Sequence, residues 1–158
     1  MNNKIFKLQI KNIAWPFLVA IFFLLDRYLK FIAITYWPNN TRQIFGDLLK
    51  FNFVPNSNIA FSLPLSGVWL SVLIAIIIVS ITSYTILNAK HLSKLEIFSL
   101  SGIILGAISN LIDRLQYGYV IDYLDLKWFT IFNLADTLIS VSTVILVIYL
   151  LKTKKDSV

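Results

Sequence analysis

Four long apolar segments alternate with polar connectors along the 158-residue chain. An α-helix needs roughly 20 mostly apolar residues to cross about 30 Å of hydrocarbon, and each segment approaches that length. The predicted spans cover about residues 12–34, 67–88, 95–113 and 136–151. The second is the least interrupted, because nothing between Lys50 and Lys90 carries a formal charge. This pattern predicts an all-α membrane protein, a four-transmembrane-helix bundle.

The connectors at about residues 35–66 and 114–135 differ in character, and the later one is too short for another folded unit. Residues 49–53 alternate like a half-buried strand, and Pro55 to Asn58 have the composition of a turn. We therefore expect a small extracytoplasmic β-hairpin or sheet on the membrane surface. The later connector is expected to form a strand, a short interfacial loop or a helix. Ser93 followed by Glu96 predicts a capping box that opens the third span.

The composition agrees with a membrane environment, since 58% of the residues are hydrophobic and 14% are charged. At this length we expect one membrane domain, residues 1–158. The net charge of +6 comes from short clusters beside apolar runs, so nucleic acid is not an expected partner. Lys4, Lys7 and Lys11 precede the first segment as in a signal peptide, but no small-residue cleavage site follows. A retained first span is expected.

Cysteine is absent, and the single histidine, His91, lies between lysines in a polar connector. Disulfides, thiolate catalysis and Cys-ligated metals are thereby excluded, and a Ser-His-Asp triad or a histidine zinc site is disfavoured. We expect no metal and no organic cofactor.

The flanking cations predict the orientation of the spans, because cytoplasmic loops carry an excess of Lys and Arg. Eight of them fall on one side of the predicted bundle and four on the other: Lys4, Lys7, Lys11, Lys90, Lys94, Lys152, Lys154 and Lys155 against Arg42, Lys50, Arg114 and Lys127. Both termini are therefore expected in the cytoplasm. This topology brings four carboxylates to the outer face, those of Asp26, Asp113, Asp122 and Asp136.

Charged groups at membrane depth cost about 2.5 to 3.5 kcal/mol each near a helix centre, so each needs a partner or a purpose. Asp26 and Lys30 are four residues apart, which favours an ion pair with a supporting role in the site. Gly102 and Gly106 continue into Asn110 and Asp113 on one helical face.

The glycines of that face predict a close helix contact. Asp113 and Arg114 can also be read as interfacial charges.

Asp122 and Asp136 are the pair that could carry chemistry. Two adjacent carboxylates can share a proton, so that one activates water while the other polarises a carbonyl. From the residues alone, catalysis, a proton relay and plain interfacial solvation all remain open. A small proton- or cation-coupled transporter or channel subunit, using Asp26, Asp113 and Asp136, is the main alternative. A noncatalytic scaffold and a Ser-Lys peptidase built on Lys30 are further ones.

The chain resembles the lipoprotein signal peptidases, the signal peptidase II family, in five motifs that span residues 26–136. Residues 26–30, Asp-Arg-Tyr-Leu-Lys, are similar to the family's D-x-x-x-K, and residues 56–61 are similar to N-x-G-x-A-F. Residues 106–114 resemble G-x-x-x-N-x-x-D-R. Residues 120–122 and 132–136 match V-x-D and F-N-x-A-D. The motifs occur in the family's order, on the side that the charge count selects.

The resemblance implies an aspartic endopeptidase of a bacterial cytoplasmic membrane, with Asp122 and Asp136 as the catalytic pair. It implies that the pocket is shaped by Asn56, Asn110, Asp113, Arg114 and Asn133. The implied substrate is a prolipoprotein whose future amino-terminal cysteine carries diacylglycerol, cut just before that cysteine on the outer side. Membrane lipid surrounds such an enzyme, and a monomer is expected.

One residue departs from the family pattern, since Asn58 stands where N-x-G-x-A-F has glycine. Asparagine tolerates a positive φ better than most residues, so the turn could survive.

Overall fold

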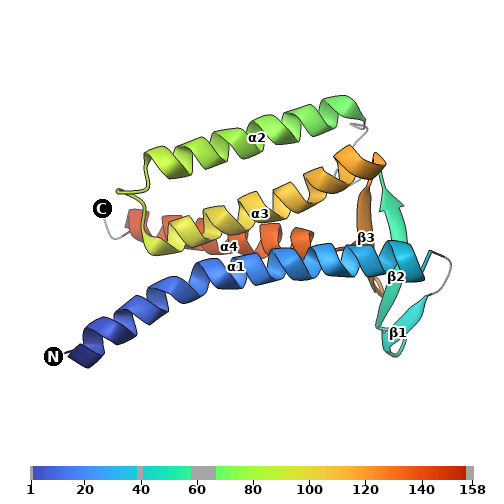
Figure 1. Ribbon diagram of the computed structural model, residues 1–158, viewed down its shortest axis with the longest axis horizontal. Helices are drawn as coiled ribbons and strands as arrows, with labels where there is room; N and C mark the ends of the chain where they lie inside the picture. Colours follow the sequence, from blue (N-terminus) through green and yellow to red (C-terminus); the bar gives the residue numbers. More distant parts are fainter. Residues whose placement is uncertain (1, 39–40, 58–66, 156–158) are drawn as a thin grey trace.

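Four helices lie side by side and a small sheet covers one end of them (Figure 1). This computed structural model describes residues 2–38, 41–57 and 67–155. Over these ranges the helices are α1 (Asn2–Tyr36), α2 (Val68–Leu87), α3 (Lys94–Tyr117) and α4 (Leu134–Lys155). The first turn of α1 and the last turns of α4 lie at the end opposite the sheet. Asn58, where the family motif has glycine, lies outside the described residues.

Three of these helices, α2, α3 and α4, are long and apolar enough to cross a membrane. The predicted first span, residues 12–34, and with it the count of four spans, is not confirmed, because α1, over its described residues, is not apolar enough by the same measure. Its second half carries Asp26, Arg27 and Lys30, which interrupt the apolar run. The described chain is therefore mostly helical, with three candidate membrane helices and a small antiparallel sheet.

The sheet has four antiparallel strands in the order β1-β2-β3-β4. They are β1 (Arg42–Phe45), β2 (Leu49–Asn56), β3 (Val120–Leu126) and β4 (Ile131–Phe132). The predicted small sheet is confirmed, and the predicted strand at residues 49–53 lies within β2. Its hairpin partner is β1, which precedes it, and residues 59–63, expected after the turn, lie outside the described residues. The segment after α3, for which a strand, a loop or a short helix was expected, forms the strands β3 and β4.

The predicted turn from Pro55 to Asn58 is wrong at its start, because Pro55 and Asn56 belong to β2. They lie opposite Ile121 and Val120 of β3. β1 pairs with β2 only as far as Phe51. Pro55 therefore has a neighbouring strand on one side only. Proline is tolerated at such an edge of a sheet, because no strand on the open side needs an N–H donor.

A buried aromatic cluster joins the sheet to α1. Phe51 of β2 stacks on Tyr123 of β3 with ring centroids 5.1 Å apart, and Trp37 meets Phe51 edge-on at 4.2 Å. Such pairs contribute about 0.5–1.5 kcal/mol each beyond their area burial. Ala33 of α1 and Ile121 of β3 complete the core of this cluster. β3 is thereby held against the end of α1.

Close packing of α3 on α4 depends on the two predicted glycines. A Cβ added at Gly106 would lie 2.7 Å from the backbone oxygen of Ala135, and one at Gly102 would lie 2.1 Å from the Ser142 hydroxyl. The predicted helix contact is confirmed. The predicted capping box at the start of α3 is also present, with the Glu96 N–H donating to the Ser93 hydroxyl and the Ser93 N–H to the Glu96 carboxylate.

Candidate active site

Asp136 lies in the first turn of α4, and its carboxylate is part of the cap of that helix. Asn133 precedes α4, and its side-chain oxygen accepts the Asp136 N–H at 2.8 Å. In return, the Asn133 N–H donates to the Asp136 carboxylate at 3.3 Å. This is the reciprocal pattern of a capping box, formed here by Asn and Asp. The helix start therefore fixes where the Asp136 carboxylate points.

The remaining free N–H groups at the start of α4 have partners from other elements. An α-helix leaves its first N–H groups without an internal acceptor. The Leu134 N–H donates to the Tyr123 hydroxyl at 3.1 Å, and the Ala135 N–H donates to the Asp26 carboxylate at 3.1 Å. The α4 terminus is thus fastened to β3 and α1, the elements that carry Tyr123 and Asp26.

Asp122 is held in the middle of β3 by two amides. Its side chain accepts hydrogen bonds from Asn133 at 2.7 Å and from Asn56 of β2 at 2.9 Å. Only 2% of Asp122 is exposed. Burial, and then the charge of Asp136, raise the pKa of Asp122 to about 7, against the lowering effect of the two amide bonds. Asp122 can therefore keep a proton near neutral pH.

Two asparagines connect the carboxylates to each other. The Asn133 amide donates to Asp122 while its oxygen accepts from the Asp136 backbone. The Asn110 amide of α3 donates to the Asp136 carboxylate at 2.7 Å, and the Asn110 oxygen accepts from Asn133 at 3.3 Å. The structure thus brings Asp122 and Asp136 into one hydrogen-bonded group.

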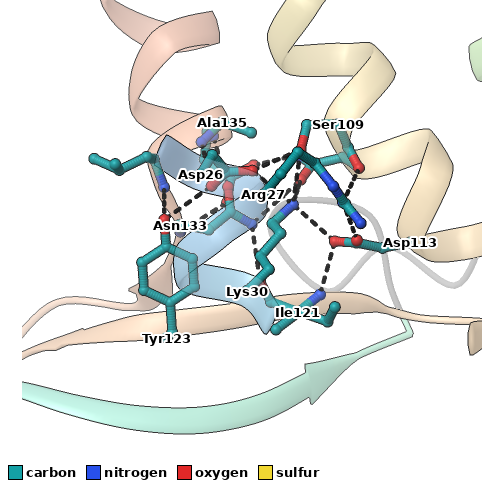
Figure 2. A network of polar contacts seen from close by, with 12 residues as sticks. Asp26, Arg27, Lys30, Ser109, Asp113, Ile121, Tyr123, Asn133 and Ala135 are labelled. Atoms are coloured by element: carbon teal, nitrogen blue, oxygen red, sulfur yellow. Dashed lines mark hydrogen bonds and ion pairs between the residues drawn. The ribbon is translucent and has the colours of Figure 1, made fainter. Parts of the chain in front are cut away.

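A buried charged network, drawn in Figure 2, contacts this group through Asn110. The Lys30 ammonium lies 2.7 Å from the Asp113 carboxylate and 3.1 Å from that of Asp26, and the predicted Asp26–Lys30 pair is confirmed. The same ammonium donates to the Asn110 oxygen at 2.7 Å. Arg27 pairs with the other Asp113 oxygen. Asp26, Lys30 and Asp113 are each no more than 1% exposed, so their charges are compensated inside the protein.

Asp113 also ties α3 to the strand that carries Asp122, because its carboxylate accepts the Ile121 N–H at 3.2 Å. Arg114, the other cation of the predicted pocket, is half-buried at the end of α3. It interacts electrostatically with three carboxylates, those of Asp136, Asp122 and Asp113. All nine predicted site residues therefore lie at the sheet end of the bundle.

Sequence reasoning missed three residues of the network, Arg27, Ser109 and Tyr123. The Ser109 hydroxyl donates to Asp26 at 2.6 Å, and the Tyr123 hydroxyl donates to the other Asp26 oxygen at 2.9 Å. Burial and the nearby Asp26 raise the pKa of Tyr123, which keeps its hydroxyl a donor. Only Arg27 and Ser109 could have been suspected from the sequence, because they lie inside the family motifs at residues 26–30 and 106–114.

The two carboxylates differ in exposure and are linked through Asn133. Asp122 is buried, and Asp136 is half-buried. Within the described ranges, no three side chains of His, Cys, Asp or Glu are grouped in a way that could hold a metal ion.

The family model described as signal peptidase (SPase) II matches residues 18–152. The chain therefore belongs to the signal peptidase II family, a family of bacterial membrane peptidases.

Several bacterial proteins named lipoprotein signal peptidase are similar over most of their length. The protein of Caldicellulosiruptor bescii is 33% identical over 89% of this chain and 91% of its own. Those of Syntrophomonas wolfei and Clostridioides difficile are 36% and 37% identical, covering 81% and 71% of this chain and 86% and 76% of theirs.

Two solved structures, each described as a bacterial membrane enzyme, share the fold. Their TM-scores are 0.80 and 0.77, at 24% and 23% identity. The first match covers 90% of both chains, and the second covers 88% of this chain and 93% of the other.

Proposed function

We propose that this protein is an aspartic endopeptidase that removes signal peptides from diacylglyceryl-modified prolipoproteins, cutting just before the lipidated cysteine. The main observation in support of the aspartic mechanism is that Asn133 forms hydrogen bonds with both residues. Its amide donates to the Asp122 carboxylate, and it bonds both the backbone N–H and the carboxylate of Asp136. The substrate class rests on the names of the bacterial relatives. No metal or organic cofactor enters the proposed reaction.

In the proposed mechanism Asp122 holds the shared proton and Asp136 is ionised. Asp136 takes a proton from a water whose oxygen attacks the scissile carbonyl carbon, while Asp122 gives its proton to the carbonyl oxygen. In the next step Asp136 protonates the leaving nitrogen as the C–N bond breaks. Asp122 recovers its proton from the tetrahedral intermediate, so the pair returns to its starting state.

The other predicted pocket residues have positioning roles. Asn56, Asn110 and Asn133 orient the two carboxylates through their amides. Asp26, Lys30 and Asp113 hold α1, α3 and β3 together behind them, and Arg114 balances the negative charge. One chain supplies every one of these groups, which supports a monomer that needs only membrane lipid around it.

The proposed location is a bacterial cytoplasmic membrane, with the active site on the outer side and both termini in the cytoplasm. α1 acts as the fourth span in this topology, because its charged residues in the network are paired inside the protein rather than facing lipid. The whole chain, residues 1–158, is proposed to form one membrane domain. An interfacial site suits a lipidated substrate, whose acyl chains stay in the bilayer while the scissile bond meets water.

The two main alternatives lack support. A relay for protons or cations should cross the membrane, whereas Asp26, Asp113, Asp122 and Asp136 gather at one end of the bundle; the relatives give a transporter no support. A Ser-Lys peptidase could use Lys30 and Ser109, whose polar atoms are 3.5 Å apart. Ser109 is fully buried and donates its hydroxyl to Asp26, so it is not poised to attack a substrate.

The test compares Asp122→Asn and Asp136→Asn with Asp47→Asn, a matched change at a surface carboxylate paired with Lys50. Each purified protein is incubated with a diacylglyceryl-modified precursor and with its unlipidated twin. We expect both site variants to fold and to lose cleavage, and Asp47→Asn to keep it. We expect the wild-type protein to cleave the lipidated precursor and not its unlipidated twin. Turnover by either folded site variant would refute the aspartic mechanism, and cleavage of both precursors would refute the lipid requirement.

A further inference from the structure

Five large apolar side chains are exposed together at one corner of the sheet, away from the proposed active site. They come from the end of β1 and the following turn, and from the turn between β3 and β4: Ile44, Phe45, Leu48, Trp128 and Phe129. We call this group the aromatic tip. Phe45 is 73% exposed, Phe129 71% and Trp128 87%. Isolated exposed apolar residues are ordinary, but a contiguous group marks an interaction surface.

The two turns of the aromatic tip form one structural unit. The Lys127 N–H donates to the Leu48 carbonyl oxygen at 2.9 Å, and Leu49 lies opposite Leu126 in the sheet. The side chains of neither turn are needed for the core of the sheet, which centres on Phe51 and Tyr123. The aromatic tip therefore presents its rings outward from a fixed backbone.

Trp128 is held in a backbone conformation that tryptophan rarely adopts. Its φ is +65°, and it is the only non-glycine residue with positive φ in the part of the chain that the structure describes. Glycine or asparagine would occupy this position at a lower conformational cost. The turn between β3 and β4 tolerates this strain at a residue whose indole is exposed, which points to a use for the ring itself.

Charged residues border the aromatic tip. Asp47, Lys50, Asp125 and Lys127 surround a shallow hollow beside it. The Lys127 ammonium lies 4.8 Å from the centre of the Trp128 ring. Rings next to lysines, at the edge of an apolar region, are typical of the layer where lipid headgroups meet acyl chains.

The position of the aromatic tip selects the lipid surface as its partner. The hairpin of β1 and β2 extends past α1, on the side away from α2, at the sheet end of the bundle (Figure 1). The strands run across the direction of the helices. If α2, α3 and α4 cross the bilayer, the sheet lies along its surface and the aromatic tip overhangs the lipids beside α1.

We propose that the aromatic tip is a membrane anchor, in which Phe45, Trp128 and Phe129 insert among phospholipid headgroups of the bilayer that the helices cross. The lysines of its border contact lipid phosphates. Because Trp128 lies two residues after the end of β3, insertion holds the strand that carries Asp122 at a fixed depth. This inference concerns the fold in the membrane and does not depend on the proposed peptidase reaction.

The first test uses Trp128 as its own reporter, in full-length protein reconstituted into phosphatidylcholine and phosphatidylglycerol vesicles. Trp15, Trp37 and Trp69 are replaced by phenylalanine, which keeps an aromatic ring at Trp37 beside Phe51. Aqueous iodide and lipids brominated at different acyl positions then quench the fluorescence. We expect strong quenching by lipids brominated near the headgroup, weaker quenching by lipids brominated near the chain end, and protection from iodide.

Two results would overturn the anchor. Full quenching by iodide without quenching by brominated lipid would place Trp128 in water. Protection from both quenchers would mean that protein covers the ring, most simply a second copy of the chain.

A second measurement keeps the test open if the triple variant does not fold. The chain has no cysteine, so Phe129→Cys and Gln43→Cys each accept one nitroxide label. Gln43 is the matched control, because it is exposed on β1 and its amide donates to Asp47. We expect the ratio of oxygen to nickel-chelate accessibility to be several-fold higher at position 129 than at position 43. Equal ratios would count against insertion.

Discussion

Asn133 performs two tasks that can be separated by substitution. Its side-chain oxygen caps α4 through the Asp136 N–H, and its amide donates to Asp122 at 2.7 Å. Serine can cap a helix but cannot supply the amide donor to Asp122. Asn133→Ser should therefore keep the cap and lose the bond, whereas Asn133→Ala should lose both.

The size of the expected change in the pKa of Asp122 follows from the kind of hydrogen bond that is removed. A hydrogen bond to a charged group contributes about 1.5–3 kcal/mol, which corresponds to about one to two pKa units. This bond lowers the pKa of Asp122, which lies at about 7 with the bond in place. Its loss should raise that pKa by about one to two units. Because the proposed reaction needs Asp122 protonated, activity should fall as pH rises through about 7 in the wild type, and only at a correspondingly higher pH in Asn133→Ser.

The assay is the pH dependence of kcat/KM for a lipidated precursor in mixed micelles, together with thermal unfolding of each variant. The plateau rate of Asn133→Ser should also fall, by about ten- to a hundredfold if the same free energy is lost in the transition state. Asn133→Ala should be less stable than Asn133→Ser by about 1 kcal/mol, the usual contribution of a helix cap. An unmoved alkaline limb in Asn133→Ser, or equal stability of the two variants, would refute this division of tasks.

The supporting structure leads to two further predictions. Asp26→Ala should cost about 3–5 kcal/mol of stability, because it removes one of the two carboxylates paired with the buried Lys30 and leaves the hydroxyls of Ser109 and Tyr123 without their acceptor. A well-folded but inactive variant, judged by thermal unfolding and cleavage, would assign Asp26 to the chemistry instead. Gly106→Ala should cost about 1–3 kcal/mol by forcing α3 from α4 at the Ala135 carbonyl. Gly118→Ala is strained by the positive φ of that residue, but it should not separate helices, because an added Cβ there would meet nothing within 4 Å beyond its chain neighbours. Distances between labelled helices would distinguish the two glycines, and an unchanged α3–α4 distance in Gly106→Ala would contradict the packing argument.

The parts of the fold that depend on local pattern could be predicted from the sequence. Apolar runs located α2, α3 and α4, and the spacing of Ser93 and Glu96 gave the start of α3. Whether α1 crosses the membrane was harder to predict, because a count of apolar residues cannot tell whether Asp26 and Lys30 face lipid or each other. The strand at Pro55 was missed because proline and asparagine signal a turn locally, and only the early end of β1 shows that the position is an open edge.

The candidate site divides in the same way. The motifs gave Asp122 and Asp136, and helical spacing gave the Asp26–Lys30 pair. The capping box at Asn133 was not predicted, although Asn and Asp three residues apart before an apolar run are visible in the sequence. Tyr123 could not be predicted, because its two partners, Asp26 and the Leu134 N–H, come from distant parts of the chain that meet only through the fold.

Asn133 and Asp136 belong both to the cap of α4 and to the proposed active site, and this limits the substitutions that could make the protein resistant to an inhibitor. A compound that binds both carboxylates and the Asn133 amide would contact groups that also start the helix. Replacing Asp136, or replacing Asn133 by a residue that cannot cap a helix, would fray the first turn of α4 and also impair the proposed reaction. Drug-resistant forms should therefore carry changes outside the cap, at residues that touch the compound but hold no part of the helix terminus.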